Sequence, residues 1–173
     1  MFDDFADEIL KADVTTKSNH LKNCQAVAVV TGIKRENTRS GPLGVLDLQL
    51  IKVASVDPAN TNVVGEKVAR TYPMYGDIDK KTYFQGLLKK DMCLLAGSPD
   101  YKKISAEDWK RIGTAAAQGA FVGMLIQLDP YEYEKGGAKR IAHNITKVGD
   151  NSATAVAKRA ALLAKGAGPE AFL

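Results

Sequence analysis

The sequence has few of the residue types on which metal sites, disulfides and catalytic triads depend. Its 173 residues include only two cysteines and two histidines. Cys24 and Cys93 lie in separate apolar stretches, not at a paired spacing such as C-x-x-C, which indicates buried thiols and no zinc or redox site. His20 and His143 have no Cys, Asp or Glu at ligand or triad spacing. We therefore expect no metal, no cofactor and no catalytic residue, and predict that the protein is not an enzyme.

Long apolar runs and phosphate-binding motifs are also missing. No stretch approaches the roughly 20 apolar residues that a membrane span needs. The first residues, MFDDFADEILKAD, are acidic where a signal peptide is basic and then apolar. We expect a cytoplasmic protein, in the host cytoplasm if it is viral, with no membrane partner. The glycine-containing segments TGIKRENTRSG and EKGGAKR match neither the P-loop nor the dinucleotide-binding pattern.

The composition that remains is that of a folded, mildly basic domain. Hydrophobic residues make up 45% and charged residues 25%, which is typical of a soluble chain that buries a core. The formal net charge is +4, and a positive surface attracts partners that carry phosphates. A polyanionic partner is therefore favoured.

Three strands are predicted in the first half of the chain. Two β-branched apolar runs flank a charged loop from Lys34 to Gly44, the pattern of a hairpin with a long connection. In the second run Leu46, Leu48 and Leu50 alternate with polar residues, so period 2 turns the leucines to a core. The third strand lies in EKVARTYPMYG and ends near a proline that cannot donate to a ladder.

Helices and a second hairpin are predicted to follow. Asp79 caps the helix KKTYFQGLLKKDMCLLAG, which Gly97 ends, and Ser105 caps a second helix. The apolar run Phe121 to Leu128, a turn at GG and a strand through IAHNI form the second hairpin. The segment Phe2 to Leu10 also has helical spacing.

The last predicted element is a helix from Ala153 to Lys165. Val156, Ala160 and Leu163 give it a narrow apolar stripe, suited either to a neighbouring protomer or to its own barrel. The element order predicts a mainly β fold, a five-stranded OB-fold-like Greek-key barrel with helices between strands three and four and a C-terminal helix. Residues 1–150 would form this domain with its short N-terminal helix, and residues 151–173 a helical tail.

Three segments carry a resemblance to a known family. They are the hairpin QAVAVVTGIKRENTRSGPLGVLDLQLIKV, the helix KKTYFQGLLKKDMCLLAG, and GAFVGMLIQLD followed by KGGAKRIAHNITKVG, in which a glycine-led strand precedes a short N-I-x-K-V strand. From about Gln25 to Gly149 the chain resembles the OB-fold single-stranded DNA-binding proteins of bacteriophage replication and recombination modules. The resemblance implies single-stranded DNA as ligand and replication or recombination proteins as partners. Such proteins commonly end in an acidic tail, whereas this chain ends in AKRAALLAKGAGPEAFL.

Basic and aromatic residues supply the chemistry that binding of single strands requires. Cations along a groove hold the phosphates, and aromatic rings stack on the bases. Three clusters would converge on the groove of an OB-fold: Lys34, Arg35 and Arg39; Lys67, Arg70, Tyr72 and Tyr75; and Tyr131, Tyr133, Lys135, Lys139 and Arg140. The alternative is that the charges form a solvated surface and the tyrosines pack at the barrel edge.

These patterns lead to a ranked set of functions. The leading hypothesis is a non-enzymatic, non-sequence-specific single-stranded DNA-binding protein that coats exposed strands during phage DNA replication or recombination, and that forms a homo-oligomer if its tail bridges protomers. The second hypothesis is a phage structural or assembly protein without nucleic-acid binding. A small enzyme with an unrecognised site is the third.

Overall fold

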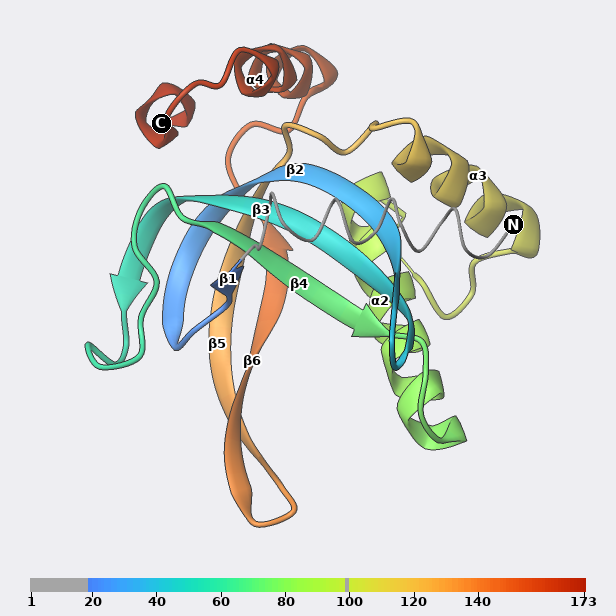
Figure 1. Ribbon diagram of the computed structural model, residues 1–173. Helices are drawn as coiled ribbons and strands as arrows, with labels where there is room; N and C mark the ends of the chain where they lie inside the picture. The colour runs from blue at the N-terminus through green and yellow to red at the C-terminus, as the bar shows by residue number, and fades with distance from the viewer. Residues whose placement is uncertain (1–18, 99) are drawn as a thin grey trace.

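A single curled sheet forms the body of the molecule, and a computed structural model describes it for residues 19–98 and 100–173 (Figure 1). Its six strands lie in the order β1-β4-β3-β2-β5-β6. The strands are β1 (Asn19–His20), β2 (Cys24–Thr38), β3 (Gly41–Ser55), β4 (Lys67–Pro73), β5 (Leu125–Lys135) and β6 (Ala138–Lys147). The helices are α2 (Ile78–Ala96), α3 (Ala106–Ala117), α4 (Ala153–Ala164) and the 3-10 turn η1 (Pro169–Phe172). The helix expected at Phe2 to Leu10 lies outside the described residues.

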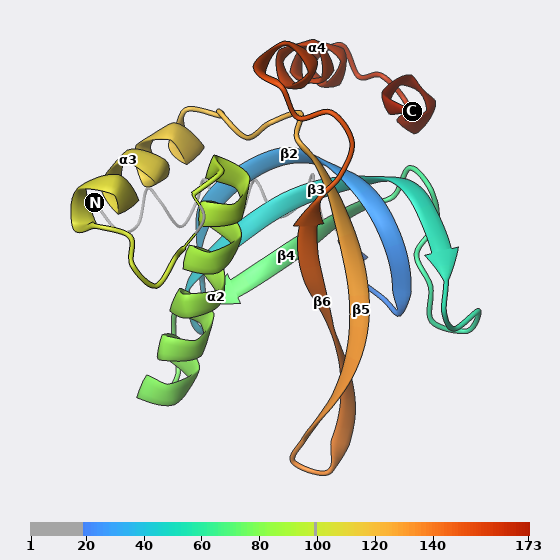
Figure 2. The ribbon, with the colours of Figure 1, turned by 180° about the vertical axis from the view of Figure 1, so that it is seen from behind.

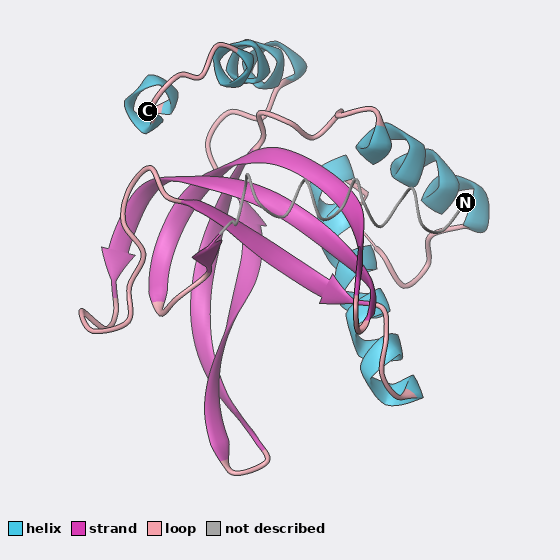
Figure 3. Cartoon of the chain, in the orientation of Figure 1, coloured by secondary structure: helices cyan, strands magenta, loops and turns pink. Residues whose placement is uncertain are grey.

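The fold class differs from the expectation of a closed five-stranded β barrel. The structure is mixed α/β, and its sheet is a curled half-barrel of six strands (Figure 3). The additional strand is β1, whose two residues pair in parallel with Val68 and Ala69 of β4. A two-residue strand carries no periodicity that a sequence could reveal. The helices lie where they were expected, with α2 and α3 between β4 and β5 and α4 after the last strand.

The long loop expected from Lys34 to Gly44 is wrong. Strands β2 and β3 continue until Thr38 faces Gly41, so that only Arg39 and Ser40 form the turn. The polar residues of this tip extend beyond the core and are solvated on both faces. They therefore lack the alternation that marks a half-buried strand.

The second hairpin also departs from its expected bounds. Strand β5 begins at Leu125, because residues before it form turns in which Gly119 and Gly123 have positive φ values of 79° and 95°. At the other end, Gly136 and Gly137 both have positive φ, as a two-residue hairpin turn requires. The residues expected in a loop around these glycines are therefore strand residues.

The core fills the concave side of the sheet. Leu46, Leu48 and Leu50 are at most 1% exposed, which confirms the predicted buried face of β3. Met92 and Leu95 from the end of α2 pack into the same cluster, and Ile112 of α3 joins it. Gly97, with a φ of 74°, ends α2 as predicted, and Ser105 caps α3. The cap of α2 is Asp77 and not Asp79, which lies in its first turn.

A buried polar network joins β4, α2 and β6 across the open side of the half-barrel (Figure 2). Arg70 Nε donates to Asp91 Oδ2 at 2.8 Å, and Arg70 Nη1 donates to the main-chain carbonyl of His143 at 2.7 Å. The Tyr72 hydroxyl donates to the same Asp91 oxygen at 2.7 Å. Burial, with the nearby Asp91 carboxylate, raises the pKa of Tyr72 well above its usual value. The network therefore holds α2 against both strands.

Helix α4 packs on the outer face of its own sheet. Phe172 of η1, which is 6% exposed, clusters with Val29, Ile51 and Leu125, and Leu162 and Leu163 pack against this cluster. The sequence suggested two partners for the apolar stripe of α4, a neighbouring protomer or its own barrel. In the structure the helix packs against its own sheet.

The start of α4 approaches the chain before β5 very closely. A Cβ atom on Gly123 would lie 2.3 Å from the Val156 carbonyl oxygen, so only glycine fits there. Arg159 Nε donates to the Gly123 carbonyl at 2.6 Å and fastens the contact. None of the helices in the described part of the chain is long and apolar enough to cross a membrane.

We predict that Phe172→Ala lowers the free energy of unfolding by about 3 kcal/mol, because it leaves an apolar cavity against the sheet. Leu173→Ala is the matched control: the side chain is 71% exposed, so stability should change by less than about 0.5 kcal/mol. Urea denaturation of both variants measures the difference. Equal stabilities, with light scattering showing loss of a dimer in Phe172→Ala, would place this segment on a neighbouring protomer instead.

We predict that Asp91→Ala lowers the free energy of unfolding by about 3–5 kcal/mol, because Arg70 is left as a buried charge without its partner. Tyr72→Phe removes one hydrogen bond to a charged group and should cost about 1.5–3 kcal/mol. Urea denaturation compares the two. Similar small losses in both variants would show that water replaces Asp91 and that the network does not hold the fold together.

Candidate nucleic-acid interface

Two residues expected to bind nucleic acid lie in the interior. The predicted face shared by Val68, Arg70 and Tyr72 exists, but it faces the core. Tyr72 is 0% exposed, so its ring has no free surface on which a base could stack. The Arg70 guanidinium is committed to Asp91 and to β6. Both residues organise the fold, so a candidate interface has to be sought among other side chains.

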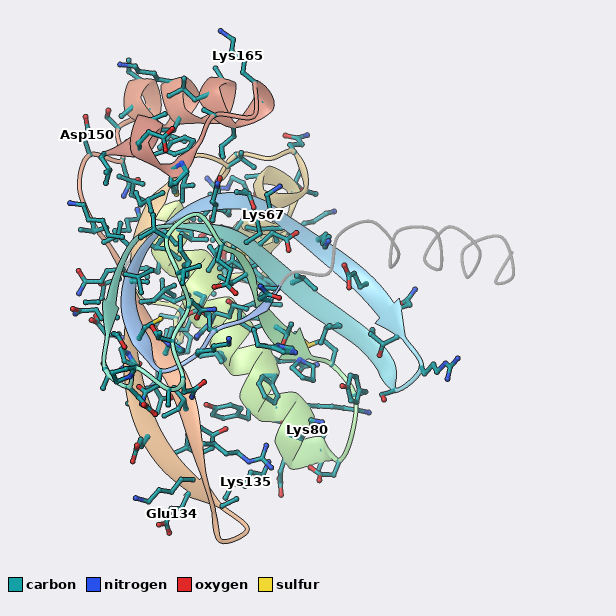
Figure 4. All side chains as sticks on the ribbon, turned by 60° about the vertical axis from the view of Figure 1, so that its left-hand side comes forward. Lys67, Lys80, Glu134, Lys135, Asp150 and Lys165 are labelled. Atoms are coloured by element: carbon teal, nitrogen blue, oxygen red, sulfur yellow. The ribbon has the colours of Figure 1, made fainter. Side chains whose placement is uncertain are left out.

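The remaining predicted cations do not gather in one groove. Lys67 begins β4, at the end remote from the β2–β3 tip, and Figure 4 shows it well apart from Lys135. Lys34 forms ion pairs with Glu36 at 2.9 Å and Asp47 at 3.3 Å. Arg35 and Arg39 are exposed near the β2–β3 tip. The three clusters therefore do not converge as the sequence predicts.

The β5–β6 hairpin projects beyond the rest of the sheet (Figures 1 and 2). Strand β2 pairs with β5 only from Leu125 to Leu128, so from Asp129 onward β6 is the only one of the described strands that pairs with β5. We call this projecting part, residues 129–144, the arm. All residues from Tyr131 to Arg140 are exposed, so both faces of the arm meet solvent.

The two faces of the arm carry different charges. Residues directly opposite each other in an antiparallel pair share a face. Tyr133 lies opposite Arg140, and Tyr131 and Lys135 lie opposite alanines, so this face is aromatic and basic. The other face holds Glu132 and Glu134, with Lys139 directly opposite Glu134 on β6; Lys139 Nζ lies 3.9 Å from Glu132 Oε2.

Helix α2 adds a third tyrosine to the aromatic face of the arm. The ring of Tyr83, which is 57% exposed, meets Phe84 edge to face with centroids 5.1 Å apart. Partial burial and the nearby Tyr131 side chain raise the pKa of Tyr83. Tyr131 and Tyr133 are 39% and 40% exposed, with ring centroids 6.3 Å apart. We define the tyrosine surface as Tyr83, Tyr131, Tyr133, Lys135 and Arg140.

No local sequence pattern marks Tyr83 as a binding residue. Tyr83 lies beside the apolar stripe of α2, and the pattern predicts burial for the stripe residues Phe84 and Leu87. Its position beside Tyr131 depends on how α2 packs against β6, and no local pattern encodes that packing. Tyr131, Tyr133, Lys135 and Arg140 were predicted as binding residues, and the structure brings these four to one face.

The tyrosine surface has the composition that sequence-independent binding of single strands uses. Each base can stack on an exposed ring for about 1–3 kcal/mol, and cations beside the rings neutralise phosphates. Glu132 and Glu134 lie on the opposite face of the arm, so their charges do not line the surface. The arrangement can therefore bind an unpaired, polyanionic chain.

Comparison with known proteins adds no further constraint. No protein-family model and no curated protein matches this chain.

Cys24, Cys93 and His143 are buried side chains of types that can bind metals or act as nucleophiles. Among residues 19–98 and 100–173, no group of three or more His, Cys, Asp or Glu side chains is placed to hold a metal ion. Cys24 and Cys93 are buried free thiols, as expected. His143 is 4% exposed, its Nε2 has no hydrogen-bond partner within the described part of the chain, and burial lowers its pKa.

We predict that His143 makes the protein less stable in mild acid. Its pKa in the folded protein lies below the usual histidine value of about 6.5, so the neutral ring is favoured there and the unfolded chain binds the proton first. Stability is full above about pH 6.5 and falls as pH decreases toward the folded pKa, by at most about 1.4 kcal/mol per pH unit. The nearby charge of Arg70 also lowers the pKa of His143, and that of Asp129 raises it.

Urea denaturation between pH 5 and 8 tests this, with His143→Gln as the variant that cannot titrate. The difference in unfolding free energy between wild type and His143→Gln should change with pH below about 6.5. His20→Gln, at an exposed histidine, is the control and should follow the wild-type profile. Parallel profiles for wild type and His143→Gln would contradict a role for His143.

Proposed function

We propose that the protein binds single-stranded DNA without sequence specificity and coats exposed strands during DNA replication or recombination. The observation that carries this proposal is the segregation of the arm: two tyrosines, Lys135 and Arg140 on one face, next to Tyr83, and two glutamates on the other. The role in phage replication or recombination follows the resemblance of residues 25–149 to phage single-stranded DNA-binding proteins.

Single strands fit the tyrosine surface better than a duplex does. In a duplex the base faces are stacked on one another, whereas unpaired bases can turn onto aromatic side chains. The arm is a narrow two-stranded projection, and stacking on its exposed rings is sequence-tolerant because every base has a π-face. Binding should therefore tolerate any sequence and should weaken as salt rises, because phosphate contacts release counterions.

We further propose that the half-barrel is an OB-fold-like Greek-key barrel. Apart from β1, the strand order is β4-β3-β2-β5-β6, and the helices enter between β4 and β5. This order, three meandering strands with the fourth beside the first, supports the assignment. OB-folds bind oligonucleotides with their hairpin loops, which here are the β2–β3 tip and the arm.

We predict that Tyr133→Ala weakens binding of oligo-dT about tenfold, which is about 1.4 kcal/mol, because it removes one exposed stacking ring. The thermal midpoint should change little, since the side chain is 40% exposed. Glu134→Ala is the matched control on the opposite face of the same arm, and it should bind as tightly as wild type or slightly more tightly. Fluorescence anisotropy with labelled oligo-dT and a duplex of equal length measures all three proteins.

Two results would contradict the proposal. Wild type that binds the duplex as tightly as the single strand would remove the argument from stacking. Equal affinities for wild type, Tyr133→Ala and Glu134→Ala would place the DNA elsewhere on the molecule.

A further inference from the structure

A second aromatic and basic pair lies at the other side of α2. Tyr75 follows β4 and packs on the β2–β3 tip, where a Cβ atom on Gly41 would lie 2.6 Å from the Tyr75 Cβ. The Lys80 ammonium lies 4.5 Å from the centroid of the Tyr75 ring. Tyr75 is only partly buried, so part of its ring meets solvent. This pair combines the two groups that hold a base and a phosphate.

The first turns of α2 connect this pair to the tyrosine surface. Residues three and four apart lie on the same helix face, so Lys80 is adjacent to Tyr83 and Phe84. Tyr83 in turn lies beside Tyr131 on the arm. The side-chain view in Figure 4 shows Lys80 on α2 and Lys135 on the arm at the same end of the molecule, with Lys165 at the opposite end. Aromatic and basic side chains thus follow one another from the β2–β3 tip to the arm.

Nearby carboxylates do not interrupt this series. The Asp77 side chain turns back to its own helix and accepts a hydrogen bond from the Lys80 main-chain N–H at 2.8 Å. Asp79 precedes Lys80 by one residue, and adjacent helical residues do not face the same side. Lys80 itself has no carboxylate within ion-pair distance among the described residues.

We propose that a single strand bound at the tyrosine surface continues along the first turns of α2 to Tyr75, with Lys80 contacting the phosphates between the two stacking positions. This inference rests on the proposed function and adds the path and the length of the ligand. A short oligonucleotide occupies the tyrosine surface, which has more rings and cations. Only a longer strand reaches Tyr75, so the affinity gained with length depends on Tyr75 and Lys80.

The test measures the affinity of the full chain for labelled oligo-dT of about 4 and about 16 nucleotides, the range that one OB-fold covers. Tyr75→Ala should weaken binding of the long strand about tenfold and leave the short strand unchanged, while Tyr75→Phe retains wild-type affinity for both. Lys80→Ala should lower the log–log salt slope for the long strand by about 0.7, one lost phosphate contact. Lys165→Ala, an exposed lysine at the far end of the molecule, should change neither.

The outcomes separate this inference from the function on which it rests. If wild type binds neither oligonucleotide, the proposed function itself fails. If both bind and Tyr133→Ala weakens them, but Tyr75→Ala and Lys80→Ala behave like Lys165→Ala with both lengths, the function stands and the path along α2 is overturned. Equal losses for short and long strands in Tyr75→Ala would also overturn it, because Tyr75 would then not be a separate position.

Discussion

The buried ion pair between Arg70 and Asp91 is the interaction on which the arrangement of the molecule depends. The sheet curls without closing, so β4 and β6 face each other with no strand ladder between them. Arg70 spans this opening because its guanidinium donates hydrogen bonds to Asp91 of α2 and to the main chain of β6. The Tyr72 hydroxyl donates a further hydrogen bond to the Asp91 carboxylate. Buried charges are costly unless all are paired, so the network admits few alternative positions for α2. The position of α2 in turn sets Tyr83 beside Tyr131.

The arm has two chemically different faces because it is a two-stranded ladder. Beyond Leu128 the two strands pair only with each other, and the strand period of two sorts tyrosines and cations to one face and glutamates to the other. The same residues in a loop would not be sorted. The outer face of the sheet, by contrast, is occupied by α4 and η1 through Phe172 and Arg159. The exposed aromatic residues are therefore concentrated away from the helix that covers the outer face.

The sequence predicted the features that depend on neighbouring residues alone, such as strand alternation, helix caps and helix stops. The alternation around Leu48, the stop at Gly97 and the cap at Ser105 all hold in the structure. The direction of a strand face was harder to predict. The sequence indicated a binding face for Arg70 and Tyr72, with solvated charge and packing at the barrel edge as the alternative, and the structure places both in the interior. Their burial depends on Asp91, which α2 brings from a distant part of the chain. The place of Tyr83 depends on the same packing, so four of the five residues of the tyrosine surface were predictable and the helical one was not.

Ultraviolet cross-linking of bound oligo-dT to the intact protein, followed by peptide mass spectrometry, tests the central claim most directly because it locates the strand without altering the protein. The account predicts cross-links at Tyr83, Tyr131 or Tyr133, since stacked rings hold the bases in contact. Cross-links confined to α4 and η1, or to the loop between β3 and β4, would contradict it, because the strand would then lie on a surface without the stacking rings.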